Sequence, residues 1–366
     1  MPTDLCNLNC IYCFHATKIN NQSQMDLETL NHIYKAIFSS YDKVKFIWHG
    51  GEPLIMGVDF LTKAIEMQFD YPMATIRNSI QTNLTLVSDK FIEFAKNYKI
   101  GIGGSYDGIR NEDTRGYSSD IMKSSKRLID NDIQHGFIMV VSKINIDTLI
   151  SSYIFFKERK QNFTINLYVA DGHEKSANLE LEPTYSSKKI IELFDYWLFD
   201  NDSNIEISYF MRFVKFIFTG EKAICTYNSC LGKFLAIRFN GDIVPCNRMF
   251  PDYYSYGNVH QYTDITEAFQ SEGFYRLLED SIVRREKCKG CEIYSMCTGG
   301  CNNQALMGGD IRNPSKNSCE LLYNVYIHID KTMREIIKEE SKIKKLNVPL
   351  MNYILAITNN RTRVQC

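Results

Sequence analysis

The distribution of cysteine is the feature that most limits what this chain can fold into. Three of its 12 cysteines lie within the first 13 residues, and eight more fall within 225–319. None lies between Cys13 and Cys225. A disulfide scaffold is usually short and secreted, whereas clustered thiols in a long chain with no export signal more often bind metal. We therefore expect two metal-binding regions separated by a cysteine-free one.

Size and charge exclude several classes of protein. The chain has 366 residues, of which 44% are hydrophobic, enough for one large domain plus a smaller one. The formal net charge is −1 and no polybasic arm or acidic tail is present, so nothing favours nucleic acid or a membrane surface as partner. No apolar stretch is long enough to span a membrane. We expect a soluble, cytoplasmic protein.

Helical and strand-like patterns alternate from residue 26 to about residue 200. Apolar residues at a spacing of three to four predict helices over 26–40, 58–69, 88–98, 118–131, 147–157 and 185–199. Short apolar or β-branched runs between them predict strands over 44–48, 74–80, 100–105, 136–142 and 163–169. This alternation is typical of parallel βα units, and five or six such units form a partial or full barrel. Functional residues then belong in the loops that follow the strands.

The region from Gly220 to Cys319 has a different character. It is rich in Cys, Gly, Asn and Tyr, with a short strand-like run at Leu235–Phe239 and a turn at Asn240–Asp242. So little apolar periodicity indicates a region organised by metal rather than by a large core. A long amphipathic helix is expected over 320–344, and the tail beyond it is ambiguous.

The N-terminal cysteines, Cys6, Cys10 and Cys13, have the spacing CxxxCxxC. Thiolates suit both iron–sulfur clusters and zinc. Three cysteine ligands without a nearby fourth leave one iron of a cubane cluster with a free coordination position. Catalytic zinc sites likewise keep one coordination position free for a ligand. A zinc site completed by His15 or by a distant ligand is the alternative, and the spacing alone leaves it open.

This triad and three later stretches resemble the radical S-adenosylmethionine (SAM) enzymes. The triad stands in the pattern CxxxCxYC, and each later stretch follows a predicted strand. The later stretches are His49–Pro53, which looks like the GGEP motif of that family; Gln81–Asn83, which resembles its QTNG loop; and Ser105–Gly108, which resembles its SxDG segment. Leu84 stands where the QTNG loop has glycine, and Arg115 follows Ser105 after a shorter gap than in related enzymes.

The resemblance implies a reactive [4Fe–4S] cluster on the triad, whose open iron chelates the methionine part of SAM. In that family the reduced cluster cleaves SAM to a 5′-deoxyadenosyl radical, which abstracts hydrogen from the substrate. The implied cofactor contacts are Tyr12, Gly50, Gly51, Glu52, Asn83, Ser105 and Arg115. Glycines let the backbone approach a ligand, a carboxylate can pair with its ammonium group, and arginine can bind its carboxylate with two hydrogen bonds.

The later cysteines resemble the seven-cysteine SPASM signature of radical SAM enzymes that modify peptides and proteins. Its core is CxxCx5CxxxC over 288–301, and Cys225 adds an eighth thiolate, enough for two fully ligated [4Fe–4S] clusters. The resemblance implies an inner auxiliary cluster on Cys225, Cys230, Cys246 and Cys301, and an outer one on Cys288, Cys291, Cys297 and Cys319, which makes three [4Fe–4S] clusters in the protein. Two zinc ribbons are the alternative, and Cys366 fits neither set.

By this resemblance the fold class is α/β: a partial (β/α)6 TIM-like radical SAM barrel, a small cysteine-rich SPASM domain and a C-terminal helix. We expect the barrel over 1–205, a bridging segment over 206–224, the SPASM domain over 225–325, and the helix and tail over 326–366. Only five residues precede Cys6, although a barrel should supply a strand there. We expect this strand to be vestigial or the chain to begin inside it, with no winged-helix leader-binding domain.

The resemblance indicates the chemical class better than the substrate. The preferred hypothesis is maturation of a precursor peptide or protein by a crosslink or another oxidative modification, with a ferredoxin or flavodoxin as electron donor. The alternative is an anaerobic sulfatase-maturating enzyme, which oxidises Cys or Ser to formylglycine. In that group an aspartate directly after an inner-cluster cysteine accepts the substrate proton, but here Asn247 follows Cys246. Asparagine is no carboxylate base, although Asp252 or Glu292 could compensate.

Two aromatic stretches and two other classes of protein complete the set of hypotheses. Tyr253–Tyr256 either lines a peptide site or packs around the clusters, with packing favoured, and Tyr209–Phe218 is expected to dock the C-terminal domain on the barrel. A zinc or nucleic-acid-binding module would explain the CxxC pairs but not Gly50–Pro53. A plain ferredoxin would not explain the βα half.

Overall fold

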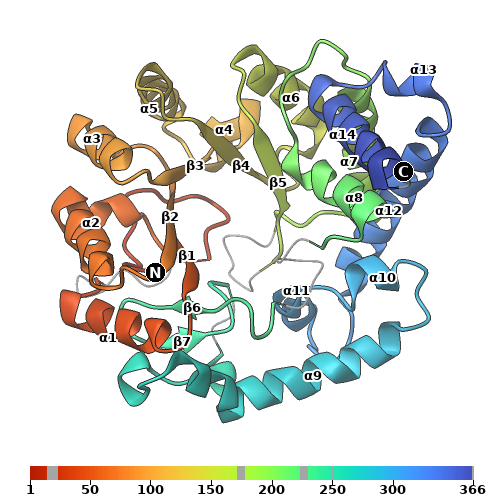
Figure 1. The fold of residues 1–366 in the computed structure, drawn as a ribbon. Coiled ribbons are helices and arrows are strands. Elements are labelled where there is room, and N and C mark those ends of the chain that lie inside the picture. Colours follow the sequence, from red (N-terminus) through yellow and green to blue (C-terminus); the bar gives the residue numbers. More distant parts are fainter. Residues whose placement is uncertain (15–23, 171–177, 223–229, 249–250, 365–366) are drawn as a thin grey trace.

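The computed structural model describes residues 1–14, 24–170, 178–222, 230–248 and 251–364. Within these residues, five parallel strands form one sheet in the order β1-β2-β3-β4-β5. They are β1 (Lys43–Trp48), β2 (Thr75–Thr82), β3 (Gly101–Ser105), β4 (His135–Val141) and β5 (Phe163–Leu167). The sheet is curled, with helices along its outer side (Figure 1). This is the half-barrel of βα units that the alternating pattern predicts.

Helices connect the successive strands and shield the sheet from solvent. They are α1 (Leu27–Phe38), α2 (Gly57–Glu66), α3 (Asp89–Asn97), α4 (Asn111–Thr114), α5 (Ser118–Asp130), α6 (Leu149–Glu158) and α7 (Pro183–Leu198). Side-chain caps set where some of them begin. The Asp26 carboxylate accepts a hydrogen bond from the Thr29 amide at the start of α1, and the Ser88 hydroxyl accepts one from the Phe91 amide in α3. Except for the short α4, these helices lie close to the predicted spans.

Single parallel bridges extend the sheet at both of its edges. Thr3 pairs with Gly50 beside β1, and Ile207 pairs with Phe163 beside β5. The strand expected before the cysteine loop is therefore present as one bridge at Thr3. The partial barrel consists of five full strands flanked by these two bridges.

The aromatic helix α8 (Ser208–Thr219) joins the barrel to the C-terminal helices. Phe210 is fully buried, and its ring lies 5.2 Å from that of Phe194 on α7 in an edge-to-face contact. On the same helix, the ring of Phe213 lies 5.8 Å from that of Tyr326 on α12 (Lys316–Ile336). The segment predicted to dock the C-terminal part on the barrel therefore does so.

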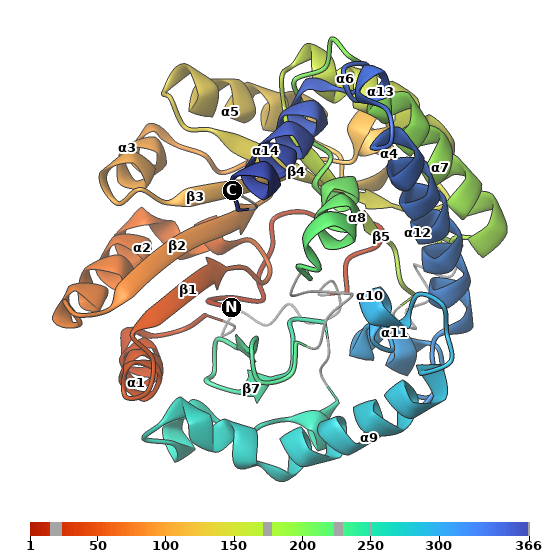
Figure 2. The ribbon, with the colours of Figure 1, turned by 45° about the vertical axis from the view of Figure 1, so that its right-hand side comes forward.

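The cysteine-rich region closes the gap between the first and last units of the curled sheet. Its elements are β6 (Ala236–Ile237), β7 (Ile243–Val244), α9 (Glu272–Cys288), α10 (Tyr294–Cys297) and α11 (Asn302–Met307). β6 and β7 pair antiparallel across the predicted turn, where Gly241 has a φ of 86°. Both ribbon views place this region between α1 and α12 (Figures 1 and 2). A 2.7 Å ion pair between Arg238 and the buried Asp4 ties the hairpin to the N-terminal segment.

In the described C-terminal residues, the helix predicted over 320–344 is divided into two helices, and a third helix follows them. They are α12 (Lys316–Ile336), α13 (Glu340–Ile343) and α14 (Val348–Val364). Pro349 is compatible with the first turn of a new helix but not with the interior of a continuous one, so the ambiguous tail becomes a separate helix. In the part of the chain that the structure describes, no helix is both long and apolar enough to cross a bilayer.

Candidate active site

The three N-terminal thiols lie in one loop that is anchored on both sides. The amides of Gly51 and Glu52 donate to the carbonyls of Thr3 (2.9 Å) and Leu5 (2.7 Å), and the Ile11 amide donates to the Thr114 carbonyl (3.0 Å). Cys10 is buried, while Cys6 and Cys13 are half-buried. Burial raises the pKa of the Cys6 and Cys10 thiols, and the neighbouring thiols raise it further. The predicted triad is therefore brought together by the fold.

The glycines after β1 allow this loop to approach the sheet. A Cβ atom on Gly50 would lie 2.4 Å from the Thr3 carbonyl oxygen, and one on Gly51 would lie 2.0 Å from that of Leu5. Gly50 also has a φ of 135°. The close approach that requires glycine is thus to the chain that carries the thiols. Direct contact of these glycines with a cofactor stays a prediction.

Glu52 is a buried carboxylate that connects the loops after β1 and β2. It is 1% exposed. Its Oε1 accepts from the Leu54 amide (3.0 Å) and the Thr82 hydroxyl (2.8 Å), and its Oε2 accepts from the Asn83 amide (2.7 Å). Burial raises its pKa, and these hydrogen bonds oppose the rise. Glu52 therefore organises the site through the chain itself, and its predicted pairing with an ammonium group stays a prediction.

The loop after β2 contacts the cysteine loop and the end of β3. Asn83 Nδ2 donates to Asn7 Oδ1 at 3.0 Å and lies 3.9 Å from Cys6 Sγ. Gln81 Nε2 donates to the Ser105 hydroxyl at 3.0 Å. Leu84, which stands where the QTNG loop has glycine, adopts a φ of 64°. This left-handed conformation explains why glycine suits the position.

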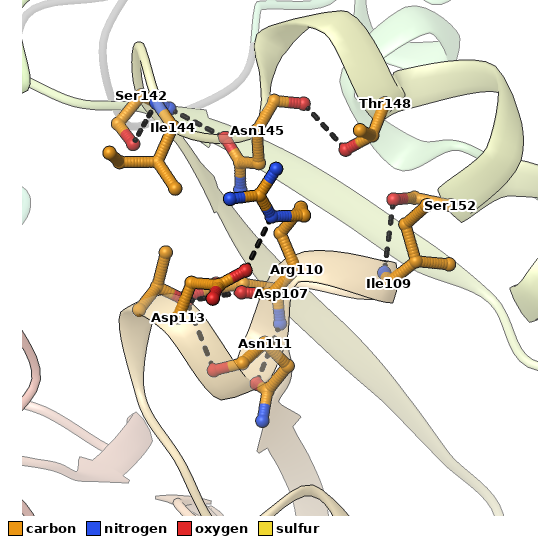
Figure 3. A network of polar contacts seen from close by, with 11 residues as sticks. Asp107, Ile109, Arg110, Asn111, Asp113, Ser142, Ile144, Asn145, Thr148 and Ser152 are labelled. Carbon is orange, nitrogen blue, oxygen red and sulfur yellow. Dashed lines mark hydrogen bonds and ion pairs between the residues drawn. The ribbon is translucent and has the colours of Figure 1, made fainter.

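Asp107 lies at the centre of a polar network that residue patterns only hinted at. Its Oδ2 accepts from the Tyr12 hydroxyl (2.6 Å) and the Thr114 hydroxyl (2.7 Å), and its Oδ1 accepts from the Val140 amide (2.8 Å). Figure 3 shows Asp107 beside Asn111, whose side-chain oxygen accepts from the Asp107 amide at 3.0 Å. Burial raises the pKa of Asp107, while Arg115 lowers it.

Arg115 joins this network to a cavity beside the thiols. Its Nη1 donates to the Tyr12 hydroxyl at 2.6 Å, while its Nε is buried and without a hydrogen-bond partner among the described residues. The cavity, of about 490 Å³, is lined by Cys6, Cys13 and Arg115. A buried guanidinium N–H without an acceptor is unfavourable unless a ligand supplies one. Arg115 can therefore donate to an anionic ligand here, and its predicted contact with SAM stays a prediction.

A second cavity, of about 440 Å³, lies where the barrel meets the cysteine-rich region. The end of β5 lines one part of it, and Cys230, Cys246, Asn247 and Cys301 line another. Its charged residues come from separate parts of the chain and form no local motif, so sequence reasoning missed them. They are Glu180, Arg212, Arg248 and Arg285.

The two carboxylates suggested as substitutes for the missing aspartate lie elsewhere. Asp252 and Glu292 are both exposed, and neither is among the described residues that line this cavity. The Glu292 carboxylate instead accepts a hydrogen bond from the Tyr323 hydroxyl at 2.7 Å. Glu180 is the single carboxylate among the described lining residues. The structure therefore does not bring Asp252 or Glu292 to the cavity that Asn247 lines, and a compensating role for either stays a prediction.

The described members of each predicted auxiliary set lie near one another. In the outer set, burial and the nearby Cys288 and Cys319 thiols raise the pKa of Cys297 to about 12, and burial with Cys288 and Cys291 raises that of Cys319 to about 11. Three members of the inner set, Cys230, Cys246 and Cys301, line the second cavity. Cys225 and Cys366 lie outside the described residues.

No three His, Cys, Asp or Glu side chains in the described ranges are close enough to hold a single metal ion. In an iron–sulfur cluster each thiolate binds its own iron, so its ligands need not converge on one point. The thiol arrangement is thus compatible with clusters of this kind.

The tyrosines at 253–256 pack inside the cysteine-rich region. Tyr254 and Tyr256 are 2% and 1% exposed, and the Tyr254 hydroxyl donates to Asp280 at 2.6 Å. Tyr253 is half exposed and is not among the described residues that line the second cavity. The favoured interpretation, packing around the cysteines, is in agreement with this burial.

Comparisons with known proteins follow the same division of the chain. Residues 1–155 match the family model of the radical SAM superfamily, and residues 225–292 match that of an iron–sulfur cluster-binding domain, SPASM. The cysteine-type anaerobic sulfatase-maturating enzyme of Clostridium perfringens is 28% identical over 318 residues, which cover 81% of this chain and 85% of the relative. The serine-type enzyme of Bacteroides thetaiotaomicron is 26% identical over 92% of this chain and 89% of its own. A solved structure described as native anSMEcpe with bound AdoMet superposes with a TM-score of 0.79 at 24% identity, covering 91% of this chain and 98% of that one.

Proposed function

Because the chain is a radical SAM enzyme with a SPASM domain, acting on a peptide or protein, we propose that it oxidises a cysteine or serine side chain of its substrate to formylglycine. The observation that carries this proposal is similarity to the cysteine-type sulfatase-maturating enzyme over 81% of this chain and 85% of that relative. It reverses the order that the sequence alone suggested, in which peptide crosslinking came first.

The reactive centre belongs to the first cavity. We assign the SAM-binding [4Fe–4S] cluster to Cys6, Cys10 and Cys13, and the SAM carboxylate to Arg115, whose buried Nε has no acceptor among the described residues. When bound, cluster and cofactor supply the 5′-deoxyadenosyl radical that abstracts hydrogen. Tyr12 orients Arg115, and Asp107 holds the Tyr12 hydroxyl. The Arg115 guanidinium is thus already held in position before the cofactor binds, so binding does not have to reorient it.

The auxiliary centres belong to the cysteine-rich region. We assign an inner [4Fe–4S] cluster to Cys225, Cys230, Cys246 and Cys301, and an outer one to Cys288, Cys291, Cys297 and Cys319. The proximity of the described members of each set supports this division. Clusters held there would supply acceptors for the substrate electron, and a ferredoxin or flavodoxin would be the electron donor to the reactive cluster.

The second cavity is the proposed substrate site. Oxidation of a serine hydroxyl to the aldehyde removes a hydrogen atom, an electron and a proton. Oxidation of a cysteine thiol removes the same three and gives a thioaldehyde, which water hydrolyses to the aldehyde with release of sulfide. Asn247 cannot take that proton, and Glu180 is the carboxylate that shares its cavity. We therefore assign the proton to a Glu180 carboxylate oxygen.

Peptide crosslinking remains a second candidate because of Asn247. A crosslinking enzyme has no need of the aspartate that sulfatase-maturating enzymes carry at this position. Detection of an aldehyde in the product separates the two candidates, because formylglycine contains an aldehyde group and a crosslink does not.

The test uses anaerobically reconstituted protein with SAM, a reductant and three matched peptides that carry Cys, Ser or Ala at one position. We expect iron for about three clusters per chain, release of 5′-deoxyadenosine, and an aldehyde that a hydrazide reagent labels in the Cys or Ser peptide only. The variant with Cys6, Cys10 and Cys13 all changed to Ala should release no 5′-deoxyadenosine. Stoichiometric zinc in place of iron would overturn the assignment, and a crosslinked product without aldehyde would favour the second candidate.

A further inference from the structure

Arg284 is a buried cation that no carboxylate neutralises in the described part of the chain. It lies within α9 and is 1% exposed. Its Nε donates to the Gly299 carbonyl at 2.8 Å, its Nη1 donates to the Ile311 carbonyl and its Nη2 donates to Asn302 Oδ1. All three acceptors are neutral. An arginine stays charged in proteins, so the fold buries a full positive charge that has no counter-ion among the described residues.

The acidic residue one turn away on the same face of the helix is already engaged. Asp280 stands one turn before Arg284 on α9. Its carboxylate accepts from the Tyr254 hydroxyl at 2.6 Å and forms an ion pair with Arg312. Removing two charges from water is tolerated when they pair, whereas burial of one alone is strongly unfavourable. Another anion is therefore needed to explain Arg284.

The contacts of Arg284 connect the segments that carry the auxiliary thiols. Cys288 follows it by one turn of α9, so both side chains lie on the same face. Gly299 lies between Cys297 and Cys301, and Asn302 directly follows Cys301. Burial lowers the pKa of Arg284, while Cys301, Cys288 and Cys297 raise it. The guanidinium thus faces thiols from both proposed cluster sets.

We infer that Arg284 is the shared counter-charge of the two auxiliary clusters and raises their reduction potentials. The inference rests on the cluster assignment of the proposed function. A [4Fe–4S] centre with four thiolates is an anion, and its reduced state is more negative still. A nearby buried cation stabilises the reduced state more than the oxidised one, because the low dielectric strengthens the attraction. Arg284 is a positioning residue that acts on the clusters and not on the substrate.

The neighbouring arginines differ in ways that make them useful references. Arg285 lines the second cavity, and Arg312 is 60% exposed and paired with Asp280. Arg276 lies two turns before Arg284 on α9, half exposed and paired with Glu272. Arg276→Gln therefore removes a charge of the same type from the same helix, at a position where water screens it.

The experiment is an anaerobic redox titration followed by electron paramagnetic resonance. It uses full-length reconstituted protein in which Cys6, Cys10 and Cys13 are all Ala, so that only the auxiliary centres give a signal. Iron content is measured on every sample. We expect Arg284→Gln to lower the reduction equilibrium constant of the auxiliary clusters by about tenfold, which is about 59 mV for a one-electron couple. Arg284→Lys keeps the charge and should stay within about threefold of the parent, as should Arg276→Gln.

Each outcome decides a separate point. Unchanged potentials in Arg284→Gln with full iron would overturn the inference and leave the cluster assignment intact. A tenfold shift in Arg284→Lys would also overturn it, because geometry rather than charge would then be responsible. If Arg284→Gln cannot be reconstituted with its auxiliary clusters, Arg284→Lys decides alone. Near-parental reduction potentials of its auxiliary clusters would then support the inference. A parent with no auxiliary iron would overturn both the inference and the cluster assignment.

Discussion

Arg115 Nη1 donates a hydrogen bond to the Tyr12 hydroxyl at 2.6 Å, which joins the segment after β3 to the cysteine loop across 103 residues of chain. Tyr12 in turn donates to the buried Asp107. A cation and an anion are thus connected through one phenol group beside the three thiols. The contact holds one side of the guanidinium, while its buried Nε has no hydrogen-bond partner among the described residues.

Arg115→Lys should weaken SAM binding while leaving the clusters in place. Lysine keeps the charge but loses the planar fork that can hold a carboxylate and Tyr12 together. We expect the dissociation constant to rise about tenfold, or about 1.4 kcal/mol. Equilibrium dialysis against reconstituted protein measures it. The control is Arg110→Lys, at a half-exposed arginine paired with Asp113, which should bind like the parent. Parental affinity in Arg115→Lys would remove Arg115 from the site.

Tyr12→Phe should destabilise the iron-free chain. The substitution removes a donor from the Asp107 carboxylate, which is fully buried, and an acceptor from Arg115. Leaving buried polar groups short of a partner costs about 1–3 kcal/mol. Urea unfolding monitored by circular dichroism gives the free energy of unfolding. Tyr253→Phe, at a half-exposed tyrosine, is the matched control and should change it little.

Substitutions of Leu84 compare two opposing contributions to the free energy of unfolding at one position. Its φ of 64° is strained for leucine by about 1–2 kcal/mol, and its side chain is fully buried. Truncating a buried leucine costs about 2–5 kcal/mol, so the cavity should outweigh the relief of strain. We expect Leu84→Gly to lower the free energy of unfolding, but by less than Leu84→Ala, which keeps the strained conformation. A Gly variant more stable than the parent would show that strain dominates.

Local patterns were sufficient for the main helices and strands of the barrel, but they missed α9, the break in the helix predicted over 320–344 and the long-range contacts. Half-buried strands such as β1 and amphipathic helices such as α5 leave a periodic signal, because each must bury one face. The Tyr12–Asp107 hydrogen bond leaves none, since its partners lie far apart in the chain. The same holds for Glu180 and Arg284, whose environments are made by distant segments. Motifs identified the cysteine loop because its ligands are close in sequence.

Folding stability should fall below about pH 6.5 in part because of His135. Burial lowers the pKa of this imidazole, whose Nε2 lies 2.8 Å from the Ser125 hydroxyl. The unfolded chain therefore binds this proton at a higher pH than the folded one. The His135 contribution is zero above the ordinary pKa, becomes increasingly destabilising as pH falls from the ordinary pKa to the lowered one, and is constant below it. Urea unfolding at several pH values should show a shallower decline for His135→Gln than for the parent. Equal slopes would exclude a role for His135.

Glu180→Gln should separate cofactor cleavage from substrate oxidation. Glu180 shares its cavity with Cys246 and Asn247 and is the one carboxylate among the described lining residues. Glutamine keeps the size of the side chain but cannot take a proton. We expect aldehyde formation to fall by about 100-fold or more, while 5′-deoxyadenosine is still released.

Two carboxylates outside the cavity provide controls for this experiment. Asp252→Asn and Glu292→Gln alter exposed side chains and should leave both rates near those of the parent. A further variant, Asn247→Asp in the Glu180→Gln background, returns a carboxylate to the same cavity and should restore part of the aldehyde yield. Undiminished aldehyde formation in Glu180→Gln would mean that the proton leaves by another route, such as solvent. Failure of both rates together would instead place Glu180 in SAM binding or folding.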